Sequence, residues 1–169
     1  TFDFGLRQEL YYMVTGLGNY NIGTLVNYQQ QNRARTCTFV NSHDTFRPIL
    51  DANGNYSQPL GTASGWDTSN ELWNGHIDPR EPRLAAAYAV IFGMDGTPTV
   101  FFEDLFDIGT TSKRFTHLPT NTTDLPQRSD IANLVWCYQN LNFKGGSYLV
   151  RWQAADALVI ERSGKALVC

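Results

Sequence analysis

Apolar residues recur at helical spacing near the start of the chain. Residues 5–15 place four apolar side chains on one helical face: Leu6, Leu10, Met13 and Val14. Gly16 and Gly18 are typical of the end of such a helix. A second short helix is expected over residues 24–31.

The clearest helix signal lies near residue 80. Asp78 is a helix-capping residue type, Pro79 suits a first turn, and Glu81 completes the pattern of a capping box. The apolar face that follows consists of Leu84, Tyr88, Ile91 and Phe92. One more helix is expected to begin at Ser129 or Asp130. Its inner face would hold Ile131, Leu134, Val135, Tyr138 and Leu141.

Two apolar segments alternate with these helices and are typical of strands buried on both faces. ARTCTFV covers residues 34–40 and GTPTVFFED covers residues 96–104, and both are rich in β-branched and aromatic side chains. Between residues 34 and 143 the order is strand, loop, helix, strand, loop, helix. That order indicates a parallel sheet with right-handed crossovers.

The last part of the chain has a different pattern. After Gly145 and Gly146, three short apolar runs follow one another, SYLVRW, ALVIER and KALVC. They are separated by the turn residues Ala155-Asp156 and Ser163-Gly164, which predicts antiparallel pairing.

Composition narrows the class of protein. The 169 residues are 42% hydrophobic, enough for a core, and only 17% charged, with a formal net charge of −3. This balance argues against a nucleic-acid or anionic-membrane partner, which would call for a basic surface. No apolar run reaches the roughly 20 residues of a membrane span. The chain opens without a basic leader, so a processed or excised chain is expected.

Cysteine and asparagine positions add two smaller expectations. Cys37, Cys137 and Cys169 lie too far apart for a zinc motif, and we expect buried free thiols. Asn55 and Asn121 begin glycosylation sequons within polar loops.

Polar groups follow both predicted parallel strands. FVNSHDT, residues 39–45, places His43 and Asp44 straight after the first strand, and Glu103 and Asp104 end the second. The carboxyl ends of parallel strands share one edge, so these side chains should lie on the same rim. The long loop that follows the first strand, roughly residues 45–77, is of the kind that is usually functional in compact domains.

These segments resemble the α-amylase family of glycoside hydrolases (family thirteen type). FVNSHDT is similar to its fourth conserved region, usually F-V-D-N-H-D, and LAAAYAVIFGMDGTPTVFFEDLF is similar to the helix and eighth strand of its (β/α)8 barrel. TFDFGLRQEL resembles the sixth strand with its helix, and WQAADALVIERSG resembles the start of the β-sandwich domain after the barrel. The resemblance is collinear and spans nearly the whole chain.

The resemblance implies an α/β fold class. Residues 1–143 would be the back section of a TIM-type (β/α)8 barrel, about strands six to eight. Residues 144–169 would be the first antiparallel strands of a small β domain, apparently truncated. Three strands cannot close a barrel, so we expect the missing barrel half to come from the same chain or from another.

The resemblance also implies roles for individual residues. Asp44 would be the carboxylate that stabilises the transition state, and His43 would hydrogen-bond sugar hydroxyls in the same subsite. Asp104 matches the aspartate of strand eight and would support the rim or contact substrate. The long loop offers further candidates for substrate contacts: the aromatic residues Tyr56, Trp66 and Trp73, which could stack on glucose or only pack the loop, and Arg47, a substrate ligand or a loop anchor.

The sequence departs from the usual family form at three positions. Asn41 and Ser42 stand where the family usually has Asp and Asn, which leaves subsite detail and any chloride dependence open. Glu103 stands where the family usually has Gly, and its role is unexplained. Pairing Asp44 with Glu103 as acid and nucleophile is disfavoured, because the family assigns neither role to these strands.

The expected activity is that of a retaining hydrolase of α-1,4-glucans. Its nucleophile and general acid, about 5 Å apart, would come from strands four and five, which this segment lacks, so the segment alone is expected to be inactive. We expect no metal site or cofactor within the segment, although calcium could bind through the missing part. The partner would be an α-glucan, and the location secreted or periplasmic.

Two alternatives to an α-amylase stay open. The chain could belong to a transglycosylase or an α-glucosidase of the same family, which share the motif after strand seven. It could also be a non-catalytic glucan-binding fragment or pseudoenzyme, which the missing catalytic strands favour and the intact His43-Asp44 pair disfavours.

Overall fold

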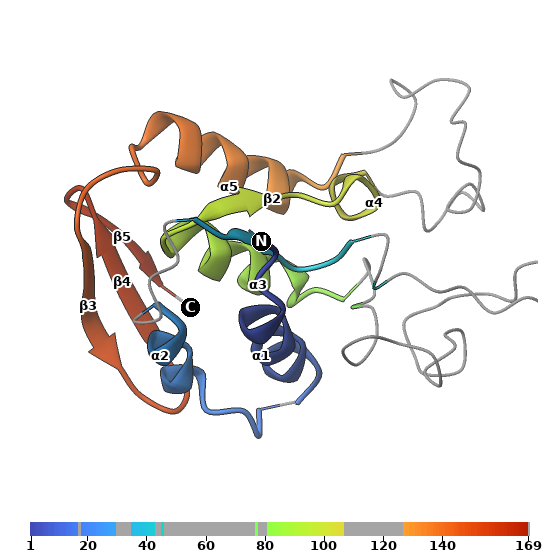
Figure 1. Ribbon diagram of the computed structural model, residues 1–169, viewed down its shortest axis with the longest axis horizontal. Coiled ribbons are helices and arrows are strands. Elements are labelled where there is room, and N and C mark those ends of the chain that lie inside the picture. Colours follow the sequence, from blue (N-terminus) through green and yellow to red (C-terminus); the bar gives the residue numbers. More distant parts are fainter. Residues whose placement is uncertain are drawn as a thin grey trace, which may run out of the picture.

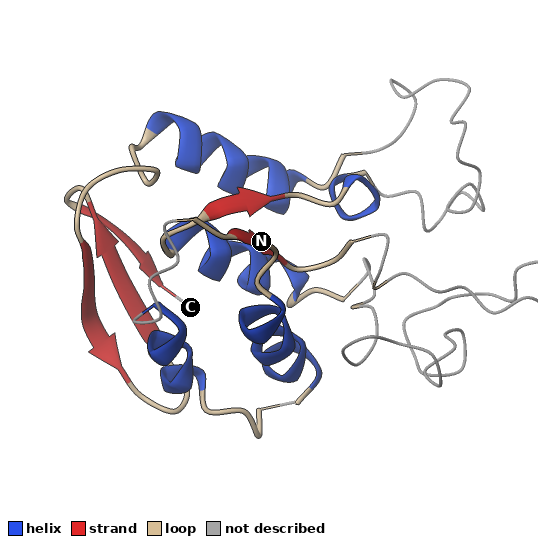
Figure 2. Ribbon diagram, viewed as in Figure 1, coloured by secondary structure: helices blue, strands red, loops and turns tan. Residues whose placement is uncertain are grey.

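The computed structural model of the chain combines helices with two small sheets (Figure 1). It describes residues 1–16, 18–29, 35–42, 45, 77, 81–106 and 127–168. One sheet has two parallel strands and the other has three antiparallel strands. Figure 2 colours the strands red and the helices blue. The mixed α/β class expected from the sequence is therefore confirmed, while the strands in the described ranges form no closed barrel.

Helix α1, Phe4–Thr15, agrees with the predicted first helix. The Asp3 side chain caps it by accepting a hydrogen bond from the Leu6 amide at 3.0 Å. The four apolar side chains predicted for its inner face are all buried. After Gly16 the chain forms a short 3-10 helix, η1 (Ile22–Leu25), and then α2 (Val26–Gln29), in place of the single helix expected over residues 24–31.

The parallel sheet pairs β1, Cys37–Phe39, with β2, Thr97–Thr99. Cys37 lies opposite Thr97 and Phe39 opposite Thr99, so the two strands advance in register toward one edge. Helix α3, Leu84–Gly93, lies between them in the chain and contacts β1. It also packs against both α1 and α5, Ser129–Asn140. The alternation read from the sequence thus produces the parallel pairing that it predicted.

Helix α3 begins later than its capping signals suggested. Its first residue is Leu84, and Arg83 stands at the N-cap without a side-chain capping bond. Glu81 instead accepts from the Arg83 amide and pairs with the Arg83 guanidinium. Pro82 explains the difference, because the residue before a proline is disfavoured in helical conformation, and here that residue is Glu81. Asp78 and Pro79 lie outside the described residues.

The second predicted strand is shorter than residues 96–104, and it is not buried on both faces as expected, because Thr97 and Thr99 are exposed and Pro98 is half-buried. Extended pairing stops at Thr99, and Phe102–Leu105 form one helical turn, α4. The amide of Phe106 donates to the carbonyl of Phe102 at 3.0 Å and ends this turn. The turn carries the side chain of Asp104 into the interior, where it is fully buried.

The antiparallel sheet matches the three predicted runs. It consists of β3 (Tyr148–Gln153), β4 (Leu158–Arg162) and β5 (Lys165–Val168) in that spatial order. Ser163 and Gly164, with φ of 51° and 73°, join β4 to β5 through a two-residue turn of the kind that suits twisted hairpins.

One hydrophobic core connects these elements. Leu158 and Ile160 of β4 belong to the same buried cluster as the inner faces of α1 and α3. Tyr88 and Phe92, expected in the core, are buried there. On α5 only Ile131 of the predicted inner face is fully buried, while the partly buried Leu134, Val135 and Tyr138 pack against the cluster. The division of the chain between residues 143 and 144 stays a prediction.

Two of the three cysteines lie in the described ranges. Cys37 and Cys137 are free thiols there, as expected, but both are half-buried where full burial was predicted. Cys169 lies outside the described residues, as do Asn55 and Asn121.

Candidate functional site

The two parallel strands meet at their carboxyl ends through side chains. Asn41, two residues beyond β1, donates from its amide nitrogen to both carboxylate oxygens of Asp104, each at 3.0 Å. Asn41 is 2% exposed and Asp104 is 0% exposed. A buried carboxylate needs hydrogen-bond donors to offset its desolvation, and Asn41 supplies one. The strand ends therefore share one rim, as the sequence predicted for the residues that follow each strand.

Asn41 also ties a distant part of the chain to this rim. Its amide nitrogen donates to the carbonyl of Ile77 at 2.9 Å, and its side-chain oxygen accepts from the Ile77 amide at 3.0 Å. This pair of bonds has the same pattern as the two hydrogen bonds that paired strands exchange between their backbone amides and carbonyls. Ile77 is buried, so the amide side chain satisfies backbone groups that would otherwise lose hydrogen bonds.

Tyr88 of α3 is also part of this hydrogen-bond network. Its hydroxyl donates to Asp104 Oδ2 at 2.6 Å and accepts from the Phe101 amide at 3.2 Å. Burial raises the pKa of Tyr88 well above its usual value, and the neighbouring charge of Asp104 raises it further. The phenol is therefore a permanent donor to the carboxylate at any physiological pH.

The Tyr88→Phe substitution should lower the free energy of unfolding by about 1–3 kcal/mol, because it deprives a buried carboxylate of a donor and the Phe101 amide of an acceptor. The measurement is chemical denaturation of the protein and its variant. Tyr148→Phe is a matched control. The Tyr148 hydroxyl is also buried, but among the described residues it has no hydrogen-bond partner, so its loss should be neutral or slightly stabilising. Equal destabilisation by both variants would contradict the assignment.

The backbone on either side of the His43-Asp44 motif is held by further contacts. Arg7 of α1, fully buried, donates from Nε to the carbonyl of Val40 at 3.1 Å. The Thr45 side chain donates to the carbonyl of Ser42 at 3.0 Å and accepts from the Ser42 amide at 2.9 Å. The Thr45 amide also donates to the Ser42 carbonyl, at 3.2 Å. The segments before and after the motif are thus fixed to the fold and to each other.

The structure describes only one of the predicted site residues in full. His43, Asp44, Arg47, Tyr56, Trp66 and Trp73 lie outside the described residues. Asp104 lies on the rim, but its carboxylate is buried and already bonded by Asn41 and Tyr88. Glu103 belongs to the backbone of α4, and its side chain is not described.

Sequence reasoning missed three residues of this rim. Arg7 and Tyr88 fall within predicted helices, where Tyr88 belongs to the predicted apolar face, and Asn41 is a departure from the usual family form. The sequence did contain one signal for these residues. Each has a polar or charged group at a position that the helix or strand periodicity places in the protein interior. Arg7 lies one turn before the inward-facing Leu10, for example, and next to Leu6.

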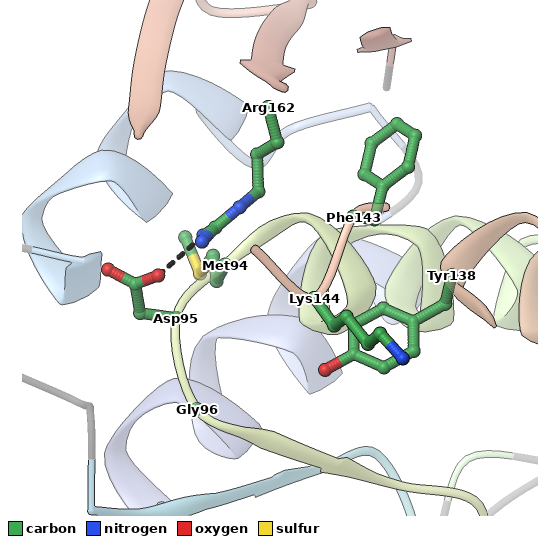
Figure 3. A pocket seen from close by; sticks show the side chains of 7 residues that line it. All are labelled: Met94, Asp95, Gly96, Tyr138, Phe143, Lys144 and Arg162. Atoms are coloured by element: carbon green, nitrogen blue, oxygen red, sulfur yellow. Dashed lines mark hydrogen bonds and ion pairs between the residues drawn. The ribbon is translucent and has the colours of Figure 1, made fainter. Parts of the chain in front are cut away.

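A small pocket lies at the opposite end of the parallel strands (Figure 3). Its volume is about 190 Å³, and it is lined by Met94, Asp95, Gly96, Tyr138, Phe143, Lys144 and Arg162. Asp95 and Gly96 come directly before β2, so the pocket is at the amino end of that strand. In parallel α/β barrels this end contributes to stability and the carboxyl end carries the chemistry.

Arg162 of β4 lines the pocket, and its side chain is only 5% exposed. Its guanidinium bonds the Asp95 carboxylate at 2.5 Å and the Gly146 carbonyl at 3.0 Å, with longer contacts of 3.4 Å to the Gly93 carbonyl and, from Nε, 3.5 Å to the Gly145 carbonyl. Gln29 of α2 donates to the other oxygen of Asp95. The bonds of Asp95 and Arg162 thus connect α2, the end of α3 and β4, which indicates a junction between elements.

Burial also raises the pKa of Tyr148, near this junction, to about 12, with a further increase from the charge of Asp95 and a partial decrease from Arg162. The phenol stays neutral through the physiological range.

Within the described ranges, no cluster of His, Cys, Asp and Glu side chains could hold a metal ion. Among the helices that the structure describes, none is long and apolar enough to cross a membrane.

Comparison with known proteins adds no family assignment. No family model matches the chain, and a search of curated proteins finds no match. The case for a function therefore rests on the motif and on the geometry of the rim.

Proposed function

We propose that this chain is part of an α-amylase-type retaining glycoside hydrolase that acts on α-1,4-glucans such as starch, glycogen and maltooligosaccharides. The observation that carries the proposal is the bond between Asn41 and Asp104, which joins the carboxyl ends of two parallel strands. The sequence puts His43 and Asp44 two and three residues after Asn41. A parallel α/β fold uses this rim for chemistry, and the motif on it resembles that of the α-amylase family.

The proposed roles follow the chemistry of each side chain. Asp44 stabilises the positive charge that develops on the sugar ring in the transition state, and His43 donates to a sugar hydroxyl beside it. Asp104 supports the rim instead of contacting sugar. It is 0% exposed, and a sugar hydroxyl would have to displace Asn41 or Tyr88 to reach it.

In the proposal, the nucleophile and the general acid lie outside this chain segment. A retaining glycosidase needs a nucleophile and a general acid about 5 Å apart, and the proposal assigns both to other strands of the same barrel. The barrel half that carries them would complete the site, in the same polypeptide or in a partner. A secreted or periplasmic location also belongs to the proposal, because starch is usually met there.

The test is an assay of the complete protein with maltoheptaose and starch, with the products followed by proton NMR from the first turnovers. We expect the newly formed reducing ends to appear first as the α-anomer, because two displacements at the anomeric carbon retain its configuration. Initial β-anomer would overturn the retaining mechanism. Glucan binding without any product would support the non-catalytic alternative, and longer oligosaccharide products would identify a transglycosylase.

A further inference from the structure

We propose that the outer face of the antiparallel sheet binds an α-glucan chain: a sugar ring stacks on Trp152 and its hydroxyls bond Arg151 and Glu161. The site is separate from the carboxyl-end rim, because the antiparallel sheet lies on the opposite side of the described structure from α4 (Figure 1). The choice of an α-glucan among neutral sugar chains rests on the proposed function, whereas the site itself can be tested without any activity.

The two faces of the antiparallel sheet differ in their surroundings. Leu158, Ile160 and Arg162 of β4 are buried against the rest of the fold. Because side chains alternate along a strand, Val159 and Glu161 point the other way, and the residues directly across the sheet share their side. This outer face therefore includes Leu149, Trp152, Val159, Glu161 and Val168.

A β-bulge adds Arg151 to the outer face beside Trp152. The register of β3 against β4 shifts between Val150 and Trp152, so Arg151 is the extra residue. In a regular strand Arg151 and Trp152 would point to opposite faces. Here Arg151 Nε donates to Glu161 Oε2 at 2.6 Å, which places both charged groups on the face that carries Trp152. Bulges re-aim side chains in this way and are over-represented next to active sites.

The indole of Trp152 is open to solvent, whereas tryptophan is on average a highly buried residue. Trp152 is 62% exposed, and Leu149 and Val168 on the same face are exposed as well. The face of the ring is apolar and electron-rich, so it attracts the C–H groups on the face of a pyranose ring, whose hydroxyls project from the ring edge. Because Trp152 belongs to a paired strand, its backbone is already ordered before a ligand binds.

The ion pair favours a neutral, hydroxyl-rich ligand over a second layer of protein. The side chains of Arg151 and Glu161 are 57% and 27% exposed, and their charges cancel. An apolar protein layer over this face would remove water from both charges without replacing its hydrogen bonds, which is costly. Sugar hydroxyls donate and accept, so they can take the place of that water.

The ion pair also has bonding capacity left and lies close to the indole. Apart from their mutual bond, Arg151 and Glu161 make no hydrogen bond to another of the described residues, so guanidinium N–H groups and Glu161 Oε1 can bond a ligand. Val159 lies across from Trp152, and Glu161 follows it by two residues, about 7 Å along the same face. A sugar stacked on the indole therefore has its hydroxyls within reach of the ion pair.

The test measures binding and hydrolysis separately in the complete protein. The variants are Trp152→Ala, Trp152→Phe and Arg151→Met. Trp136→Ala is the matched control, because Trp136 is also exposed, at 56%, but belongs to α5. Binding is the adsorption isotherm on starch granules in the cold. Hydrolysis of maltoheptaose reports on the rim, and the thermal midpoint reports on folding.

Trp152→Ala should weaken adsorption at least about 10-fold, because the stacking surface is lost. Trp152→Phe should weaken it less, since a smaller ring remains. Arg151→Met should weaken it about 3-fold through the loss of hydrogen-bond donors. The kcat and KM for maltoheptaose and the thermal midpoints should stay at wild-type values in all three, because the outer face is exposed and remote from the rim. Trp136→Ala should change none of these quantities.

Three results would overturn the glucan site. They are a wild-type protein that does not adsorb to starch, unchanged adsorption in Trp152→Ala, and an equal loss in Trp136→Ala. A thermal midpoint lower by about 4 °C or more in Trp152→Ala would also overturn it, because another part of the complete protein would then cover the outer face. Adsorption through Trp152 without hydrolysis would reject the proposed function and keep the site. Hydrolysis of maltoheptaose with equal adsorption by all variants would do the reverse.

Discussion

Replacement of Asp44 by asparagine should reduce kcat on α-1,4-glucans by about 100- to 1000-fold while the protein remains folded. The substitution keeps the size of the side chain and removes its negative charge. Under the proposed mechanism that charge faces a sugar ring that becomes cationic only in the transition state, so the loss should fall on kcat more than on KM. The measurement is steady-state kinetics with maltoheptaose, together with the thermal midpoint.

Two aspartates provide matched controls for this variant. Asp156→Asn makes the same chemical change at an exposed position between β3 and β4 and should leave both kcat and the midpoint unchanged. Asp104→Asn makes the same change at a fully buried carboxylate, which accepts hydrogen bonds from Asn41 and Tyr88. This variant should lower the thermal midpoint. If Asp44→Asn retained more than about a tenth of the wild-type kcat, Asp44 would have no role in stabilising the transition state.

Local patterns in the sequence predicted α1 and the antiparallel strands. The spacing of Leu6, Leu10, Met13 and Val14 predicts α1 almost to the residue, and the short apolar runs between turn residues after Gly146 predict β3 to β5. In α1 and β4 the buried side and the local conformational preference agree, whereas most residues of β3 and β5 are exposed. The turn between β4 and β5 could also be located from Ser163-Gly164, because few residues adopt positive φ readily.

The predictions failed where a neighbour in the sequence changed the backbone. At α3 the capping signals point to a start near residue 79, but Pro82 keeps Glu81 out of the helix, which begins at Leu84. At β2 the apolar run of residues 96–104 was read as one strand. Pairing ends at Thr99, and the last part turns into α4. An apolar run alone does not separate a buried strand from a buried helical turn.

The rim was only partly predictable for a different reason. That the polar residues after each parallel strand would lie near one edge follows from parallel pairing, and the sequence supported that much. The bonds among Asn41, Ile77 and Tyr88 join positions that no local pattern relates, and Tyr88 fits the apolar face of its helix equally well without its hydroxyl. Partner choice among buried polar groups depends on tertiary packing, which a single sequence does not encode in any spacing.

Arg162→Met should lower the free energy of unfolding by about 3 kcal/mol, because it removes a buried cation that bonds several partners at once. Asp95 is partly exposed and can be solvated when its partner is lost, so much of the cost comes from the backbone carbonyls, chiefly that of Gly146. These carbonyls belong to the end of α3 and to the segment between α5 and β3. Methionine retains most of the apolar stem of arginine, which limits the loss of packing. Urea denaturation of the protein and its variant measures the effect.

Arg151→Met is the matched control on the neighbouring strand. Arg151 pairs with Glu161 at 2.6 Å, but its side chain is 57% exposed, so water and salt screen the pair. We expect no resolvable change in its urea midpoint, whereas Arg162→Met should unfold at clearly lower urea. Similar midpoints for both variants would mean that Arg162 contributes no more than a surface ion pair. In that case the attachment of the antiparallel sheet would rest on Leu158 and Ile160, which belong to the shared core. A clearly lower urea midpoint for Arg162→Met than for Arg151→Met would instead show that the side chain of Arg162 holds β4 against α3.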